Sequence, residues 1–140
     1  MRKFSLMMVW LAVLAIVLAA CGGESNSDSD AAAAEVVGDA TKGESLYKQK
    51  LIGETNAAGC ITCHSLEEGK VLVGPSHAGI GKLAAGAVAG MSADEYLKQS
   101  IIAPNAHITD GYSPGSMYQF YGQDLTEQEI ADLVAFLKTQ

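Results

Sequence analysis

The run Cys60-Ile61-Thr62-Cys63-His64 constrains this chain more than any other feature of its sequence. Two thiols three residues apart, followed directly by an imidazole, form the attachment pattern of c-type haem. This spacing lets both thiols add to the vinyl groups along one porphyrin edge and leaves the imidazole to bind the iron from one face. Because the run occurs once, the sequence predicts one covalent haem c, with thioether bonds to Cys60 and Cys63 and His64 as an axial ligand.

Two other chemistries use closely spaced cysteines, and both explain the run less well. A thioredoxin-like redox pair requires a βαβ context, which the sequence around residues 60–64 does not show. A zinc site requires a second group of ligands, and Cys21 is the only other cysteine in the chain.

The N-terminus has the pattern of an export signal. A positively charged start, Met1-Arg2-Lys3, precedes an apolar run over residues 4–20 that only Ser5 interrupts. The run closes with Leu18-Ala19-Ala20-Cys21, which resembles the lipobox of bacterial lipoproteins. We therefore expect residues 1–20 to be a lipoprotein signal peptide and Cys21 to be acylated, so that the chain is anchored to a bacterial membrane on its periplasmic or extracellular face. The alternative is an uncleaved signal anchor.

The segment after Cys21 differs in composition from the rest of the chain. Residues 22–38 are small, polar and acidic, which is typical of a flexible tether with a reach of roughly 20–25 Å. Three parts result: the signal peptide over 1–20, the lipidated cysteine and tether over 21–38, and one domain over 39–140. Without the signal peptide the chain has seven basic and sixteen acidic side chains, a net charge of −9 that argues against a nucleic-acid partner.

The second axial ligand is predicted from the two methionines that remain after removal of the signal peptide. Met91 precedes Ser92-Ala93-Asp94-Glu95, which has the spacing of a capping box, so Met91 has a structural role in a hydrophobic staple. Met117 follows a run of turn residues over 110–116, and such a loop can fold over a haem face. We therefore predict Met117 as the sixth ligand. The rival ligands are His77 and His107.

Three segments have helical patterns. A helix is expected over 39–47, where Gly43 suggests close approach of another backbone, and a second over 92–102, before Pro104. The third opens with a capping box at Thr126 and continues to about Lys138 with apolar residues at helical spacing. Because no segment alternates with a period of two, the sequence predicts an all-α domain with almost no strand.

From about Asp39 to Gln140 the chain resembles the class I monohaem cytochromes c. The resemblance is nearest to small bacterial lipoprotein cytochromes and to the cytochrome domains appended to subunit II of haem-copper oxidases. It implies helices wrapped around one covalent haem, with Gly43 and Leu46-Tyr47 packed against the C-terminal helix around residues 133–137. It also implies that the carbonyl of Pro75 accepts a hydrogen bond from His64, and that residues 104–117 form the axial-methionine region.

Some residues depart from the family pattern. Tyr118 follows Met117 where the family often has a proline, and the stretch over 50–59 is longer than usual, so we expect a surface loop over 51–58. His77 occupies a position that is often apolar, and we interpret it as a solvated loop histidine. Lys82 is a candidate partner for a haem propionate or a solvated lysine.

The resemblance implies a carrier of single electrons between respiratory or photosynthetic membrane complexes, and not an enzyme, because His64 and Met117 would close both axial positions. One alternative is a fixed cytochrome c subunit of a larger assembly, such as an oxidase or a quinol-oxidising complex, rather than a monomeric carrier. A second alternative is a five-coordinate haem sensor or small-ligand binder, if Met117 does not bind the iron.

Overall fold

The structure is a computed structural model that describes residues 36–140. The predicted signal peptide, the predicted acylation site at Cys21 and most of the predicted tether lie outside the described residues. Within residues 36–140, no helix is both long and apolar enough to cross a membrane.

All three predicted helices are present, and each begins at the residue type that caps a helix. Helix α2 (Ala40–Tyr47) begins after Asp39, whose carboxylate accepts from the backbone N–H groups of Thr41 and Lys42. Helices α4 (Ala93–Ile102) and α6 (Glu127–Leu137) each begin with a complete capping box. These reciprocal bonds are made by Ser92 with Glu95 and by Thr126 with Glu129.

Three short helical elements were not predicted. They are a 3₁₀ turn, η1 (Cys60–Thr62), and the helices α3 (Ile80–Ala87) and α5 (Tyr121–Asp124). Helix α3 contains two glycines and follows Gly79 at φ +76°, so its sequence resembles a loop. Helix α5 is a single turn, too short for its apolar residues to form a pattern.

The only strands within residues 36–140 form a minimal hairpin. Strand β1 (Leu51–Ile52) pairs antiparallel with β2 (Ala57–Ala58), so the prediction of almost no strand is confirmed. The surface loop expected over 51–58 is this hairpin: Leu51, Ala58 and residues 54–56 are exposed. Ile52 differs from that expectation, because it is 3% exposed and belongs to the hydrophobic core. The hairpin therefore packs on the domain.

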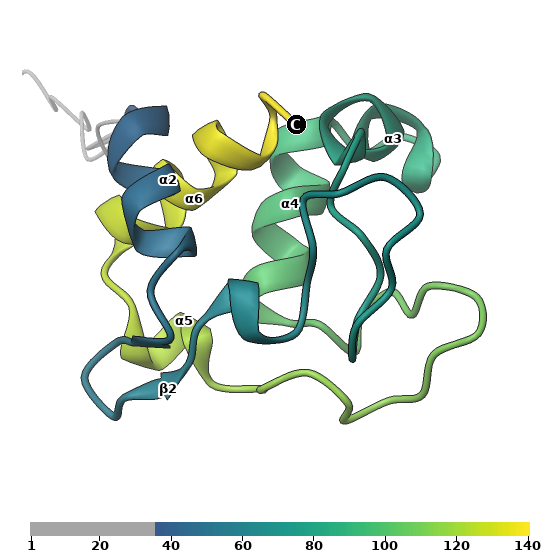
Figure 1. Ribbon diagram of the computed structural model, residues 1–140. Helices are drawn as coiled ribbons and strands as arrows, with labels where there is room; N and C mark the ends of the chain where they lie inside the picture. The colour runs from purple at the N-terminus through teal and green to yellow at the C-terminus, as the bar shows by residue number, and fades with distance from the viewer. Residues whose placement is uncertain (1–35) are drawn as a thin grey trace, which may run out of the picture. The chain divides into compact units, whose positions relative to one another are not determined.

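The crossing of α2 and α6 organises the core (Figure 1). A side chain at Gly43 would overlap the backbone carbonyl of Asp132, so glycine allows the two helices to meet. The rings of Tyr47 and Phe136 pack with their centroids 5.2 Å apart. The prediction of close approach at Gly43 is confirmed.

The buried carboxylate of Asp132 joins the N-terminal end of the domain to α6. It accepts from the backbone N–H of Asp39 at 2.7 Å and from the side-chain amide of Gln128 at 2.8 Å. Gln128 also donates to the carbonyl of Val37, and Gly38 packs closely on Ala131. The last two residues assigned to the tether thus contact α6.

Helix α4 lies beside α6, and a long irregular segment over 103–120 leads from α4 to α5 (Figure 1). Helices α2, α6, α4 and α3 lie in the upper part of Figure 1, and α5 lies below them beside β2. Between the segment over 103–120, the loop over 63–79 and the helices α4 and α6 lies the cavity described next.

Candidate haem site

A cavity of about 300 Å³ lies between η1, α4, α6 and the two long loops. Its lining is mostly apolar and aromatic, as is usual for sites that bind a large organic cofactor. Five of its lining residues are those predicted for the haem site: Cys60, Cys63, His64, Pro75 and Met117. Met91 does not line the cavity and packs against the hydrophobic core instead.

The two cysteines lie at the start and just past the end of η1. The turn is closed by backbone bonds from Cys63 and His64 to the carbonyl of Cys60, at 3.1 and 2.9 Å. Both cysteines are half-buried, and they form no disulfide. Burial raises the pKa of the Cys60 thiol to about 11, so this side chain is neutral near pH 7. The pair is thus available for two thioether bonds from one short turn.

The imidazole of His64 is fixed by a backbone carbonyl. Its Nδ1 lies 2.9 Å from the carbonyl oxygen of Pro75, which requires the proton on Nδ1 and leaves Nε2 as the unprotonated nitrogen. Burial lowers the pKa of His64, so the ring is neutral, the form that binds metals. A side chain at Gly74 would place a Cβ 2.8 Å from Nδ1, so glycine keeps this contact open.

His77 packs against His64, and its interpretation as a solvated loop histidine was wrong. The two rings are stacked, with centroids 4.0 Å apart and an interplanar angle of 16°. The Tyr47 hydroxyl lies 3.1 Å from Nδ1 of His77, and burial lowers the pKa of His77 to about 3. No local pattern indicates this arrangement, because Tyr47 and His77 are thirty residues apart.

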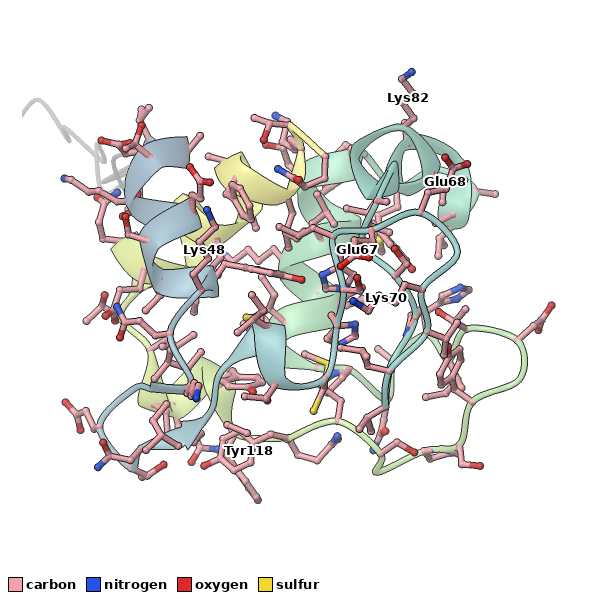
Figure 2. All side chains as sticks on the ribbon, in the orientation of Figure 1. Lys48, Glu67, Glu68, Lys70, Lys82 and Tyr118 are labelled. Atoms are coloured by element: carbon pink, nitrogen blue, oxygen red, sulfur yellow. The ribbon has the colours of Figure 1, made fainter. Side chains whose placement is uncertain are left out.

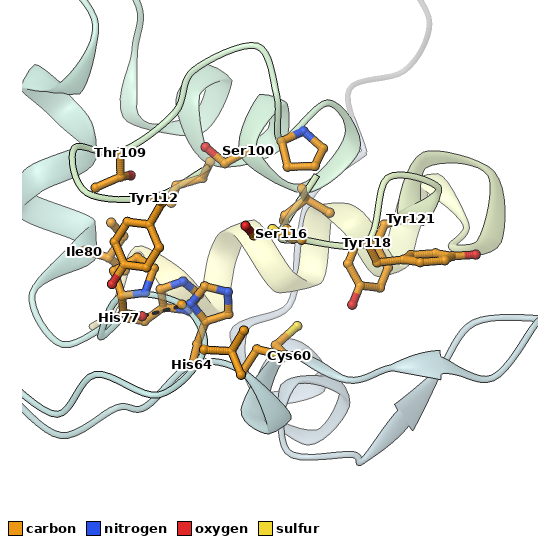
Figure 3. Close-up of a pocket in the computed structure, with 18 of the residues that line it drawn as sticks. Cys60, His64, His77, Ile80, Ser100, Thr109, Tyr112, Ser116, Tyr118 and Tyr121 are labelled. Atoms are coloured by element: carbon orange, nitrogen blue, oxygen red, sulfur yellow. Dashed lines mark hydrogen bonds between the residues drawn. The ribbon is translucent and has the colours of Figure 1, made fainter. Parts of the chain in front are cut away.

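The loop that carries Met117 faces His64 and Cys60 across the cavity, as the neighbouring Ser116 shows in Figure 3. Gly111 and Gly115 have φ values of +87° and +79°, which let the segment turn twice before Met117. The backbone N–H of Gly115 donates to Asn105 at 2.8 Å. Met117 itself is half-buried and packs on the core. His107 also lines the cavity.

Lys82 does not line the cavity. It lies on α3, and its side chain extends away from the domain into solvent (Figure 2). The structure therefore gives no support to a pairing between Lys82 and a haem propionate.

Several residues at the cavity were not predicted as site residues. Tyr96, Tyr112 and Tyr121 contribute aromatic surface to its lining. Beyond the lining, Asp124 of α5 accepts hydrogen bonds from Tyr118 and Thr55. No local pattern indicates these contacts, since Thr55 and Asp124 lie 69 residues apart.

A model of the cytochrome c family matches residues 40–140, so this chain belongs to that family. Neither the curated proteins nor the solved structures contain a significant match to it. Family membership together with the helical structure establishes the all-α class I cytochrome c fold, and it implies one covalently bound haem c. The thiols, the imidazole and the apolar cavity fit that cofactor.

The other uses of the cysteine pair do not agree with the structure. Two-residue strands are the only strands among residues 36–140, so this part of the chain has no βαβ unit for a thioredoxin-like pair. The same residues hold no group of three or more His, Cys, Asp or Glu side chains arranged to bind a metal ion, as a zinc site would require.

Proposed function

We propose that this cytochrome c carries single electrons between membrane complexes of a respiratory or photosynthetic chain. Cys60 and Cys63 would hold the haem, and the His64 imidazole and the Met117 thioether would bind its iron. The observation that carries this proposal is that one apolar cavity is lined by both cysteines, by His64 with its hydrogen-bond partner Pro75, and by Met117.

The haem supplies a one-electron couple at its iron, and the chain supplies the surroundings. The Pro75 carbonyl orients His64 and increases the basicity of its free nitrogen. A thioether from Met117 favours the ferrous state, which raises the reduction potential. Because His64 and Met117 would both bind the iron, we expect no substrate to bind there.

The spectrum of the reduced, haem-loaded protein with and without carbon monoxide tests this function. A carrier with two protein ligands shows little change when carbon monoxide is added. A large and rapid change would identify an open haem, and the chain would then be a five-coordinate sensor or small-ligand binder.

The proposed carrier is tethered to a membrane by lipid on Cys21. Support comes from the apolar run over residues 4–20 and the small residues before Cys21. A flexible tether would confine the domain near the membrane and raise its effective concentration toward complexes there. Mass spectrometry of the mature protein should find an acylated N-terminal Cys21, and an intact peptide that spans residues 10–24 would refute the anchor.

The proposed partners present basic surfaces to this acidic chain. A net charge of −9 after the signal peptide attracts such surfaces, and the attraction weakens as salt screens it. The rate of reduction by membranes of the host should therefore fall as ionic strength rises. A salt-independent rate together with co-purification in a stable assembly would instead support a fixed subunit, for example of an oxidase.

A further inference from the structure

The hairpin β1–β2 is bonded to the segment that carries Met117. The carboxylate oxygen Oδ2 of Asp124 accepts from the hydroxyl of Thr55 at 2.5 Å and from the hydroxyl of Tyr118 at 2.6 Å. The two hydroxyl oxygens are 3.3 Å apart. One carboxylate on α5 thus joins the inserted hairpin to the residue that directly follows Met117 in the chain.

The backbone reinforces the same junction. The N–H of Glu54 donates to the carbonyl of Asp124 at 3.2 Å. Gly53 has φ +72°, and a Cβ there would lie 2.9 Å from the Cβ of Asp124, so this close packing requires glycine. The hydroxyl of Tyr121 donates to the carbonyl of Ala58 at the other end of the hairpin. The hairpin therefore contacts both the first and the last residue of α5.

Further contacts restrain the chain at Met117 and at Tyr118. The ring of Tyr118 packs edge-on against Tyr121 and Phe120, with centroids 4.9 and 5.6 Å apart. The side-chain amide of Gln119 donates to the carbonyl of Met117 at 2.5 Å. Met117, Tyr118 and Tyr121 all line the cavity. Tyr118 itself lies at the edge of the domain beside the hairpin (Figure 2).

We propose that Asp124 is a positioning residue for the sixth iron ligand: through Tyr118 and the hairpin hydroxyl of Thr55, it holds Met117 over the cavity. The two departures from the family pattern, the longer stretch over 50–59 and the tyrosine after Met117, meet in this one cluster. The Asp124 carboxylate restrains the chain just after Met117, at the position where the family often has a proline and this chain has Tyr118. This inference rests on the proposed ligation by Met117.

The test uses the full haem-loaded chain and compares Asp124→Asn and Tyr118→Phe with the wild type. Asp124→Asn replaces the charged acceptor with a neutral amide, and Tyr118→Phe removes one of its two hydroxyl donors. Both variants keep Met117. The rate of carbon monoxide binding to the reduced protein should rise about tenfold, the size expected when a two-state equilibrium loses one hydrogen bond to a charged group. The sulfur-to-iron charge-transfer band of the oxidised protein should weaken in parallel.

Two controls separate positioning from general stability. Asp132→Asn alters a similarly buried, doubly bonded carboxylate between α2 and α6. It should lower the free energy of unfolding without changing the rate of carbon monoxide binding. Thr55→Val removes the hairpin hydroxyl and should act like Asp124→Asn, whereas Thr55→Ser keeps the hydroxyl and should restore wild-type behaviour. This conservative pair provides the test if the variants at Asp124 or Tyr118 do not fold.

The outcomes distinguish this inference from the proposed function. A wild-type protein that lacks the charge-transfer band and binds carbon monoxide readily would refute ligation by Met117, and the positioning role would fail with it. The positioning role alone would be overturned by a second outcome. In it the wild type has the band, and Asp124→Asn, Tyr118→Phe and Thr55→Val bind carbon monoxide no faster than Asp132→Asn does.

Discussion

The ring of His77 stacks on the ring of His64 with centroids 4.0 Å apart. The hydroxyl of Tyr47 lies 3.1 Å from Nδ1 of His77 and 3.4 Å from the carbonyl oxygen of His64. Tyr47 has no exposed surface, so its hydroxyl depends on these protein partners. A polar pair is thus built into the core directly beside the proposed iron ligand.

This pair predicts a strong coupling between two substitutions. His77→Leu should lower the free energy of unfolding by about 1–2 kcal/mol, because it deprives the buried Tyr47 hydroxyl of its nearer partner. Adding Tyr47→Phe to His77→Leu should cost little more, since both polar groups are then gone. Denaturant unfolding of the two single variants and the double variant measures this coupling. If the losses in free energy of unfolding simply add in the double variant, the two side chains do not depend on each other.

The crossing of α2 and α6 predicts that a side chain at position 43 destabilises the fold. Gly43→Ala should lower the free energy of unfolding by about 1–3 kcal/mol, because the new Cβ meets the backbone of Asp132. The matched control is Gly86→Ala on α3, where nothing lies within 4 Å of an added Cβ. There, alanine should stabilise the protein by up to about 1 kcal/mol through helix propensity. Equal effects at the two glycines would contradict the close crossing.

The hydrogen-bonded carboxylate of Asp124 should make the free energy of unfolding depend on pH in the acid range. Hydrogen bonds from Thr55 and Tyr118 lower the pKa of Asp124 below its ordinary value of about 4. A lowered folded-state pKa gives stability that is present above the unfolded-state pKa and is lost as pH falls through the folded-state pKa. The stability difference between wild type and Asp124→Asn should therefore shrink below about pH 4.

Unfolding by denaturant at a series of pH values from 7 to 3 measures this difference. Glu68→Gln, at an exposed position, serves as the control and should follow the wild type throughout. A constant difference between wild type and Asp124→Asn across the whole range would show that the carboxylate is not stabilised in the fold.

Local sequence signals predicted the parts of this fold that depend on neighbouring residues. The capping boxes at Ser92 and Thr126 mark the starts of α4 and α6, and the spacing of Cys60, Cys63 and His64 indicates the cofactor. Gly43 indicated the helix crossing because a glycine inside a helix usually has a packing reason.

The remaining features arise from contacts between residues distant in the sequence. The burial of His77 depends on Tyr47, thirty residues earlier, and the packing of the hairpin depends on Asp124. Helix α3 contains Gly81 and Gly86, so its local propensity is weak and tertiary packing decides its structure. The hydrogen bond between His64 and the Pro75 carbonyl was expected only from the resemblance to the family, because no local pattern in the sequence indicates it.

The assignment of Met117 as the sixth ligand is tested most directly by the absorption spectrum of the oxidised, haem-loaded protein. Met117→Ala should keep the covalent haem, because Cys60, Cys63 and His64 are unchanged, and it should lose the sulfur-to-iron charge-transfer band. Met91→Ala should keep that band, since Met91 lies outside the cavity lining. If Met117→Ala retains the band while Met91→Ala abolishes it, Met91 is the ligand and the account of this site is wrong.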